Sequence, residues 1–461
     1  MSLAGDRLVG RGTVHLVSLG CPKNLVDSEI ILGHLERAGY SPVAHPEEAE
    51  VIVVNTCSFI REAKEESIET ILSLATWKVD GACRALVVAG CLPQRYGEEL
   101  LELLPEVDLF LGTGEVPLFA EHLKAFEADR LRACHRDGRS YLPHAKDPRL
   151  RATSLPMAYV KIAEGCSNGC SYCVVPSIRG PLRSRTVESV CAEVRALARE
   201  GVKEIILVAQ DTTAFGLDRS SRSELPELLL ALDDVEGLEW IRVMYAHPGR
   251  VTHRLVEIMA EMKKLCPYLD LPIQHVSPEV LRRMNRGPGP RGIRERIRWL
   301  REAIPGIHLR TTFIVGFPGE TEGDFQELLG FVRETRFEWM GAFPYSKEEG
   351  TAADALGRGP GKRAVERRLH ELMSLQRGIT EELMGKWVGR SVPVLVEKGT
   401  DGRGKEALGR APFQAPEIDG VVRIRGEGMR TGSLQAVRIT EVDGYDLIGI
   451  AERERRCTAG C

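Results

Sequence analysis

Three closely spaced cysteines lie in the segment Cys166-Ser-Asn-Gly-Cys170-Ser-Tyr-Cys173. On one short loop, thiolates at positions i, i+4 and i+7 can bind three corners of a single iron–sulfur cubane, which leaves its fourth iron without a protein ligand. An iron with an open position can bind a substrate. Gly165 and Gly169 ease the backbone where such a loop wraps a cluster. We call Cys166, Cys170 and Cys173 the loop cysteines. A zinc site is the alternative, although zinc sites usually pair CxxC elements and no second pair follows.

Three further cysteines, which we call the N-terminal cysteines, each follow a short apolar run. They are Cys21 after residues 14–19, Cys57 after residues 51–54, and Cys91 after residues 85–89. Parallel strands end at one edge of a sheet, and ligands of open α/β sheets bind at that edge. We therefore expect the three thiols to converge. They are either buried structural thiols or, as we prefer, ligands of a second iron–sulfur cluster.

The pattern around these cysteines predicts two α/β domains. Up to about residue 118, Val-rich runs alternate with helical segments, which is typical of a small doubly wound domain with a parallel sheet. Six more strand candidates alternate with crossover helices in the middle of the chain, which favours a barrel or partial barrel with its site at the C-terminal strand ends. These candidates are residues 158–163, 204–210, 240–245, 269–273, 308–315 and 339–344.

The end of the chain has a different pattern. A strongly charged helical stretch, residues 361–386, leads into short β-type runs separated by Gly-rich turns. Several short strands at regular spacing indicate a small antiparallel barrel.

The CxxxCxxC spacing, with Tyr172 before the last cysteine, resembles the radical S-adenosylmethionine superfamily, in which the free iron chelates the amino and carboxylate groups of the cofactor. With the N-terminal cysteines and the stretch Ser18-Leu-Gly-Cys-Pro-Lys-Asn-Leu-Val-Asp-Ser-Glu29, the chain resembles the methylthiotransferases, which install a methylthio group on an unactivated carbon. Four stretches resemble the branch that acts on an aspartate of small-subunit ribosomal protein S12, and the branch that modifies tRNA adenosine looks different there. They are Cys21-Pro-Lys-Asn-Leu-Val-Asp-Ser, Pro176-Ser-Ile-Arg-Gly-Pro-Leu-Arg-Ser-Arg185, Leu271-Pro-Ile-Gln-His275 and Ala415-Pro-Glu-Ile-Asp-Gly420.

This resemblance implies an order of domains and a set of cofactors. The domains are an auxiliary-cluster domain at residues 12–135, a linker at 136–154, a radical core at 155–385 and a TRAM barrel at 386–456. The loop cysteines and the N-terminal cysteines would each hold one [4Fe-4S] cluster. S-adenosylmethionine would serve as methyl donor and as radical source. Ribosomal protein S12 would be the partner, with a flavodoxin- or ferredoxin-like electron donor.

Residues at the ends of the central strands are candidates for holding the cofactor. We predict contacts from Tyr172, Gln210, His275, Thr312 and Val315, although polar residues at strand ends are often only loop residues. Further candidates are Asp211, Tyr245, His247, Gln274 and Gly316.

Two other groups of residues have plainer interpretations. Arg179, Arg183 and Arg185 form a basic run whose default interpretation is a solvated face, with binding of an acidic substrate segment as the alternative. Core packing or surface positions are expected for the remaining cysteines: Cys83, Cys134, Cys191, Cys266, Cys457 and Cys461.

Charge and composition exclude several classes of protein. The chain has 62 Lys and Arg against 66 Asp and Glu, a net charge of −4, which disfavours a protein that mainly wraps nucleic acid. Residues 386–455 have 12 Lys and Arg against 11 Asp and Glu, or +1, which favours a protein substrate over tRNA. An iron–sulfur electron carrier or RNA-binding module is the alternative from another class.

No apolar run approaches the roughly 20 residues of a membrane span. Residues 1–11 lack a signal-peptide pattern, so we expect a cytoplasmic protein.

Overall fold

The computed structural model describes residues 12–136, 141–152, 156–400 and 406–452. The segment 1–11, where no signal peptide is expected, lies outside the described residues, as do Cys457 and Cys461. Among the helices of the described ranges, none is both long and apolar enough to cross a membrane.

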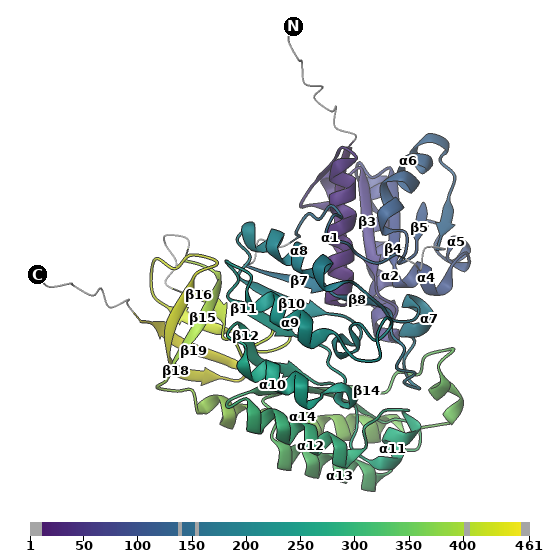
Figure 1. The fold of residues 1–461 in the computed structure, drawn as a ribbon. Coiled ribbons are helices and arrows are strands. Elements are labelled where there is room, and N and C mark those ends of the chain that lie inside the picture. Colours follow the sequence, from purple (N-terminus) through teal and green to yellow (C-terminus); the bar gives the residue numbers. More distant parts are fainter. Residues whose placement is uncertain (1–11, 137–140, 153–155, 401–405, 453–461) are drawn as a thin grey trace, which may run out of the picture.

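The N-terminal part is the predicted doubly wound domain, a parallel sheet with helices on both faces (Figure 1). Strand β3 explains why both faces are covered: Val51 and Val53 pack in the core that includes α1 and α6, whereas Ile52 and Val54 pack against α2. In spatial order the strands are β2 (Tyr40–Pro42), β1 (Gly12–Ser18), β3 (Val51–Thr56), β4 (Ala85–Gly90), β5 (Leu109–Leu111) and β6 (Ala133–His135). The helices are α1 (Pro22–Arg37), α2 (Arg61–Ala75), α3 (Trp77–Asp80), α4 (Cys91–Tyr96), α5 (Glu99–Leu103) and α6 (Phe119–Asp129), with 3-10 turns η1 (Pro46–Glu48) and η2 (Val116–Leu118).

The central part is one six-stranded parallel sheet, in which five strands lie close to their predicted ranges and the strand predicted at residues 269–273 lies at residues 265–270 instead. In spatial order they are β14 (Trp339–Pro344), β13 (His308–Val315), β12 (Leu265–Asp270), β11 (Trp240–Val243), β10 (Glu204–Val208) and β7 (Met157–Lys161). A small antiparallel pair, β8 (Ala163–Glu164) and β9 (Arg183–Ser184), and helix α7 (Val175–Arg179) flank the cysteine loop.

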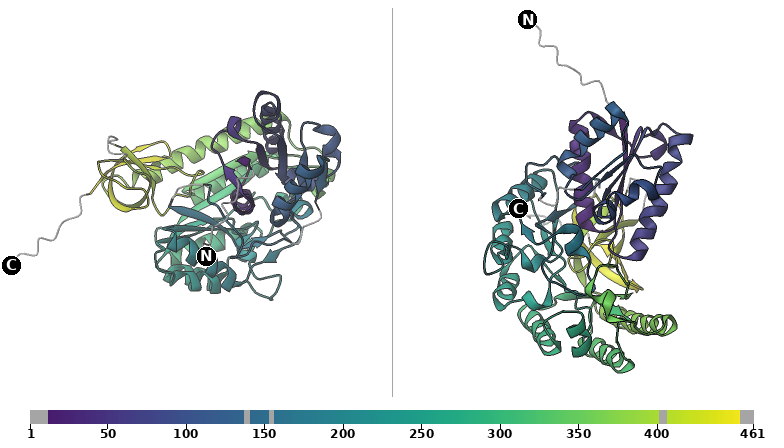
Figure 2. Two further views of the ribbon diagram at one scale, coloured as in Figure 1. Left: turned by 90° about the horizontal axis from the view of Figure 1, so that it is seen from above. Right: turned by 90° about the vertical axis from the view of Figure 1, so that its right-hand side faces the viewer.

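The crossover helices of this sheet form a curved row on its outer side, as the right-hand view of Figure 2 shows. They are α8 (Val187–Arg199), α9 (Leu225–Asp233), α10 (His253–Glu261), α11 (Pro278–Arg283), α12 (Pro290–Ala303) and α13 (Glu322–Thr335), with 3-10 turns η3 (Thr212–Ala214), η4 (Pro248–Arg250) and η5 (Ala352–Leu356). Each strand therefore presents its C-terminal end on one rim, where the candidate cofactor residues lie.

The predicted charged helix is α14 (Lys362–Gly385), and it leads to a closed five-stranded barrel (Figure 1). The barrel strands are β15 (Ser391–Lys398), β16 (Glu406–Arg410), β17 (Val422–Arg425), β18 (Leu434–Asp443) and β19 (Asp446–Ala451). Four of the five pairings are antiparallel, as predicted, whereas β17 pairs with β19 in parallel.

A buried ion-pair cluster joins this barrel to the central sheet. Glu204 on β10 accepts hydrogen bonds from Arg242 Nε (2.8 Å) on β11 and from Arg410 Nη2 (2.5 Å) on β16. Arg242 also donates to the carbonyl of Pro412 (2.8 Å), and the Trp339 indole donates to the carbonyl of Phe413 (2.8 Å). The barrel is thus attached to the central domain by buried, directional contacts.

Removing the charge of Glu204 should loosen that attachment. A Glu204→Gln substitution removes the ion-pair partner of the buried Arg242 and leaves Arg410 with Glu397 alone, and breaking a buried ion pair typically costs about 3–5 kcal/mol. We expect faster hydrogen–deuterium exchange in β16 and in residues 411–415. Glu239→Gln, at an exposed position, is the matched control. Equal exchange in the two variants would show that the cluster does not hold the barrel.

Candidate active site at the junction of the three domains

One cavity of about 560 Å³ is lined by all three N-terminal cysteines and all three loop cysteines. The N-terminal domain, the central domain and the barrel all contribute to its wall, the barrel through residues 416–418. The six thiols that the sequence singles out are therefore brought together around a single space, although they come from six positions spread over 153 residues of sequence, from Cys21 to Cys173.

The N-terminal cysteines reach this cavity because each follows the end of a parallel strand. Cys21 is the residue before α1, Cys57 follows β3, and Cys91 is the first residue of α4 after β4. Gly20 permits the close approach: its φ is +84°, and a Cβ there would lie 2.6 Å from the Cβ of Cys57. A larger residue at this position would push the loops of Cys21 and Cys57 apart.

The loop that holds the loop cysteines is fastened at both ends by main-chain hydrogen bonds. The Cys166 N–H donates to the Gly180 carbonyl (3.1 Å), and the Ser171 N–H donates to the Met284 carbonyl (2.9 Å). Gly165 has a φ of +78°, and a Cβ there would lie 2.1 Å from the Pro181 carbonyl oxygen. The role predicted for this glycine therefore has a specific steric cause.

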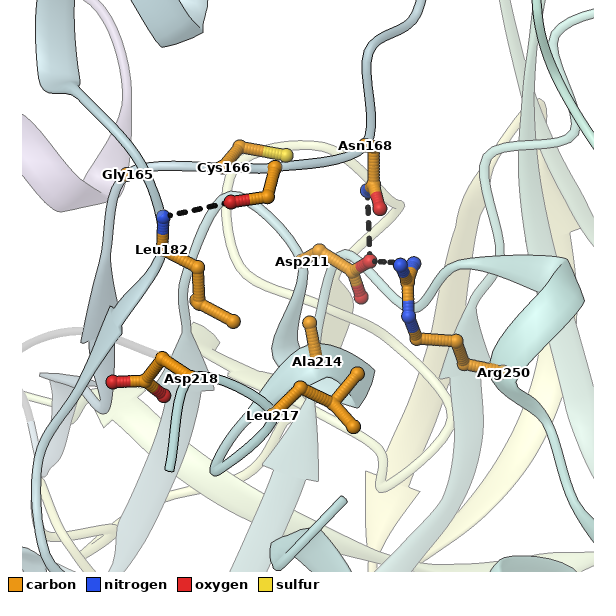
Figure 3. A pocket seen from close by; sticks show the side chains of 10 residues that line it. Gly165, Cys166, Asn168, Leu182, Asp211, Ala214, Leu217, Asp218 and Arg250 are labelled. Carbon is orange, nitrogen blue, oxygen red and sulfur yellow. Dashed lines mark hydrogen bonds and ion pairs between the residues drawn. The ribbon is translucent and has the colours of Figure 1, made fainter. Parts of the chain in front are cut away.

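A smaller pocket of about 120 Å³ lies beside Cys166 (Figure 3). On its wall, Asp211 accepts a hydrogen bond from Asn168 Nδ2 (2.8 Å) and one from Arg250 Nη1 (2.7 Å). Asn168 belongs to the cysteine loop, so the buried Asp211 carboxylate fixes that loop relative to the end of β10.

Burial keeps most of the six thiols protonated in the absence of a metal. It raises the pKa of Cys57 and of Cys173 to about 12, and it raises the pKa of Cys91 and Cys166 as well. At Cys21, burial raises the pKa but the charges of Lys23 and Arg179 outweigh it, so the pKa is lowered. Metal ions deprotonate thiols on binding, so buried, clustered thiols near cations suit a ligand set.

The most extensive polar contacts in the cavity wall belong to Arg179. Its guanidinium donates to Asp27 Oδ2 (2.8 Å), to Glu164 Oε2 (3.2 Å) and to Asn24 Oδ1 (2.7 Å), and its Nη2 lies 3.3 Å from the Sγ of Cys91. Asp27 and Asn24 lie on α1, whereas Glu164 lies on β8, so Arg179 connects the N-terminal and central domains directly beside the cavity.

Lys161 extends this network to the end of β10. Its ammonium contacts Asp27 and donates to Glu164 Oε2 (2.6 Å), and Glu164 Oε1 accepts from Gln210 Nε2 (2.7 Å). Burial raises the pKa of Glu164, but Lys161 and Arg179 outweigh burial and lower it. The buried carboxylate is therefore charged and holds Gln210 in place.

The default interpretation of the basic run as a solvated face is wrong for two of its three arginines. Arg179 is 4% exposed and Arg185 is 2% exposed, because both are paired inside the protein; Arg185 contacts Glu193 and donates to the Lys161 carbonyl (3.0 Å). The prediction failed because the acidic partners of Arg179 are distant from it in sequence and lie on other elements.

Two buried polar atoms on the cavity wall have no hydrogen-bond partner within the described residues, Gln210 Oε1 and Arg286 Nε. Arg286 also places Nη1 3.5 Å from the Sγ of Cys170. Buried polar atoms without partners are costly, so these atoms suit a polar ligand beside the loop cysteines.

In the described ranges, no group of three His, Cys, Asp or Glu side chains is arranged to hold a single metal ion. Iron–sulfur ligation by these cysteines is therefore inferred from their residue type and from their shared position around one cavity.

The predicted cofactor contacts lie in two different environments. Tyr172 and Gln210 line the cavity, as do the further candidates Asp211, Tyr245, His247 and Gln274. His275, Thr312 and Val315 are not among the lining residues. His275 and Val315 are fully buried, with His275 Nδ1 accepting from the Ser277 N–H (3.0 Å), and the Thr312 carbonyl accepts from the Gln274 N–H (2.8 Å). These three assignments stay predictions.

The cavity wall also contains strained backbone that sequence analysis did not detect. Tyr245, Gln274 and Glu417 have φ values of +60°, +76° and +68°, although none is a glycine. Such conformations cost free energy and concentrate at functional sites. Sequence analysis also missed Lys23, Arg286 and the barrel residues 416–418 as parts of the wall. Lys23 and residues 416–418 did lie in motifs that it quoted.

Comparison with known proteins identifies the family. The Radical SAM superfamily matches residues 160–332, the uncharacterized protein family UPF0004 matches residues 13–112, and the TRAM domain matches residues 388–451. The ribosomal protein uS12 methylthiotransferase RimO of Geotalea uraniireducens is 46% identical over 436 residues, which cover 95% of this chain and 97% of that protein. The chain belongs to the RimO family of methylthiotransferases. The member of this family from Pelotomaculum thermopropionicum is 48% identical over 440 residues, covering 95% of this chain and 98% of its own.

Solved structures share the fold at low identity. The radical S-adenosylmethionine methyltransferase TsrM from Kitasatospora setae superposes with a TM-score of 0.56 at 13% identity, over 80% of this chain and 89% of that chain. Membership of the radical SAM superfamily implies S-adenosylmethionine and one [4Fe-4S] cluster.

Proposed function

We propose that this chain is a radical methylthiotransferase that adds a methylthio group to the β-carbon of an aspartate in ribosomal protein uS12. The observation that best supports this function is the single cavity lined by both cysteine sets. A group transfer that needs two metal centres at one carbon requires such a shared space. Full-length relatives named as uS12 methylthiotransferases support the choice of substrate over tRNA adenosine.

The loop cysteines would hold the cluster that the superfamily implies, and the N-terminal cysteines would hold a second [4Fe-4S] cluster. When bound, S-adenosylmethionine would supply the methyl group and, on reduction at the loop cysteines, a 5′-deoxyadenosyl radical, and the second cluster would supply a site for sulfur; such a radical can remove a hydrogen that no side-chain base could take near neutral pH. Of the five predicted cofactor contacts, Tyr172 and Gln210 are supported by their place in the cavity wall. We propose the same domain limits as the sequence indicated: the auxiliary-cluster domain at residues 12–135, the linker at 136–154, the radical core at 155–385 and the TRAM barrel at 386–456.

The residues of the chain itself position the reactants. The Arg179 network locks the N-terminal domain onto the central domain, so the two cysteine sets keep a constant relation to each other. Asp211 fixes the cysteine loop through Asn168. On the barrel, Asp419 accepts from Arg310 Nη1 (2.7 Å) and from the Tyr268 hydroxyl (2.9 Å), which holds residues 416–418 at the cavity. We infer that the barrel helps to admit the protein substrate.

The reaction also needs a source of electrons and a compartment. A flavodoxin- or ferredoxin-like donor would supply electrons, and the reaction would occur in the cytoplasm, where ribosomal proteins are found. Its test is anaerobic incubation of the reconstituted full chain with S-adenosylmethionine, reductant and either uS12 or tRNA. We expect mass spectrometry to show one methylthio group on an aspartate of uS12 and no change in the tRNA. Modification of the tRNA instead, or of neither, would refute the proposal.

A further inference from the structure

Lys23 is a cation of the cavity wall for which the proposed chemistry has no role yet. It is the second residue of α1, two positions after Cys21, and it faces the cavity that the two cysteine sets share. Among the described residues, its ammonium forms no hydrogen bond and no ion pair; its close neighbour is the Tyr245 ring, whose centroid lies 3.6 Å from Nζ. A lysine ammonium has three donors, so this site offers hydrogen bonds that the protein itself does not use.

The two arginines of the wall already contact other groups of the protein, although Arg286 Nε has no partner among the described residues. Arg179 is paired with Asp27 and Glu164, and Arg286 donates to the Pro272 carbonyl (2.5 Å) and approaches Cys170. Most donors of these arginines are therefore used by protein groups, and Arg286 lies beside the loop cysteines. Lys23 also acts on a cysteine, since its charge helps to lower the pKa of Cys21, but it lines the cavity and its ammonium pairs with no acidic group of the described residues. An ammonium of this kind on a cavity wall is the arrangement expected of a group that binds a ligand.

Tyr245 makes the position of Lys23 definite. The Tyr245 backbone is in the left-handed region, with φ +60°, and its N–H donates to Asp270 Oδ2 (3.0 Å) at the end of β12. The buried carboxylate thus holds the strained residue, and the ring of that residue lies beneath the ammonium. A cation over an aromatic face is stabilised by the ring quadrupole, and because the ring covers only one side of the ammonium, the donors on the other side stay available to a ligand.

The best ligand for such an ammonium is a carboxylate, because charge-assisted hydrogen bonds are the strong ones. We propose that Lys23 binds the side-chain carboxylate of the substrate aspartate and so fixes the adjacent β-carbon between the loop cysteines and the N-terminal cysteines. This inference rests on the proposed function and adds to it the residue that selects an acidic side chain.

Two other roles for Lys23 compete with this one. It could serve only as counter-charge to ligands at Cys21, in which case its loss would release iron. It could also pair with Glu417, an exposed carboxylate of the same wall, when substrate is absent.

The test measures binding and does not depend on turnover. Full-length enzyme with both cysteine sets loaded is incubated with S-adenosylmethionine but no reductant, and the Kd is measured for uS12 and for uS12 with the modified aspartate replaced by Asn. We expect the wild type to prefer the aspartate form. Lys23→Met should weaken binding of that form by roughly 10- to 100-fold and bring it close to the Asn form. Lys23→Arg should keep most of the preference, and Lys124→Met, at an exposed position on α6, should keep all of it.

Several results would overturn the inference. They are an unchanged aspartate preference in Lys23→Met, loss of iron from that variant, or the same loss of preference in Glu417→Gln. A wild type that modifies uS12 but does not distinguish aspartate from Asn would overturn the role of Lys23 and leave the proposed function standing. A wild type that neither binds nor modifies uS12 would refute the proposed function itself.

Discussion

Replacing Cys170 with Ala should abolish formation of 5′-deoxyadenosine from S-adenosylmethionine. The three loop cysteines are the only thiols in the described part of the central domain that line the cavity, so no neighbouring thiol there can replace one of them. We expect a fall of more than roughly 100-fold, because even residues outside the ligand shell of a metal site commonly cost about 10- to 100-fold. The measurement is chromatography of the nucleoside product after anaerobic reduction.

The control for this experiment is Cys134→Ala. Cys134 lies in β6, at the edge of the N-terminal sheet, and is not part of the cavity wall. This variant should keep both its iron and its nucleoside product. Normal nucleoside formation by Cys170→Ala would show that the loop cysteines are not the site of cofactor cleavage.

Replacing Cys21, Cys57 and Cys91 together with Ala should separate cofactor cleavage from methylthio transfer. The variant should lose about half of its iron, keep the formation of 5′-deoxyadenosine, and form no methylthio product, since each cysteine set would hold one cluster. The domain junction should survive, because Arg179 loses its contact with Cys91 but keeps Asp27, Glu164 and Asn24.

Iron and sulfide analysis, run beside a nucleoside assay and mass spectrometry of uS12, measures all three outcomes on one preparation. Full retention of iron in the triple variant would show that Cys21, Cys57 and Cys91 do not hold a second cluster. Loss of nucleoside formation together with iron would instead show that the two cysteine sets form a single centre.

Much of the fold could be predicted because it follows from local patterns. Buried parallel strands are continuous apolar runs, and those of the central sheet stand out against the charged helices between them. The strand predicted at residues 269–273 was misplaced, because β12 is Leu265–Asp270 and contains Pro267, a residue that is atypical of a central strand and hides its first half from sequence analysis. The short strands β2, β5 and β6, with three residues each, are too brief to show a period.

The cysteines could be singled out from the sequence because strand ends share an edge, which is a rule of topology. The rest of the wall depends on contacts between distant elements. Arg179 is buried because its partners on α1 and β8 are brought to it, and residues 416–418 reach the cavity because Arg310 and Tyr268 hold Asp419. The parallel pairing of β17 with β19 is likewise set by the closure of the barrel. No local pattern encodes these contacts.

The central claim is that both cysteine sets serve one reaction at the aspartate β-carbon, within one cavity. The most direct measurement uses uS12 with deuterium at the β-carbon of its aspartates and follows the label into 5′-deoxyadenosine by mass spectrometry. The account predicts that deuterium appears in the nucleoside as methylthio product accumulates. Methylthio product formed without any transfer of deuterium would contradict it.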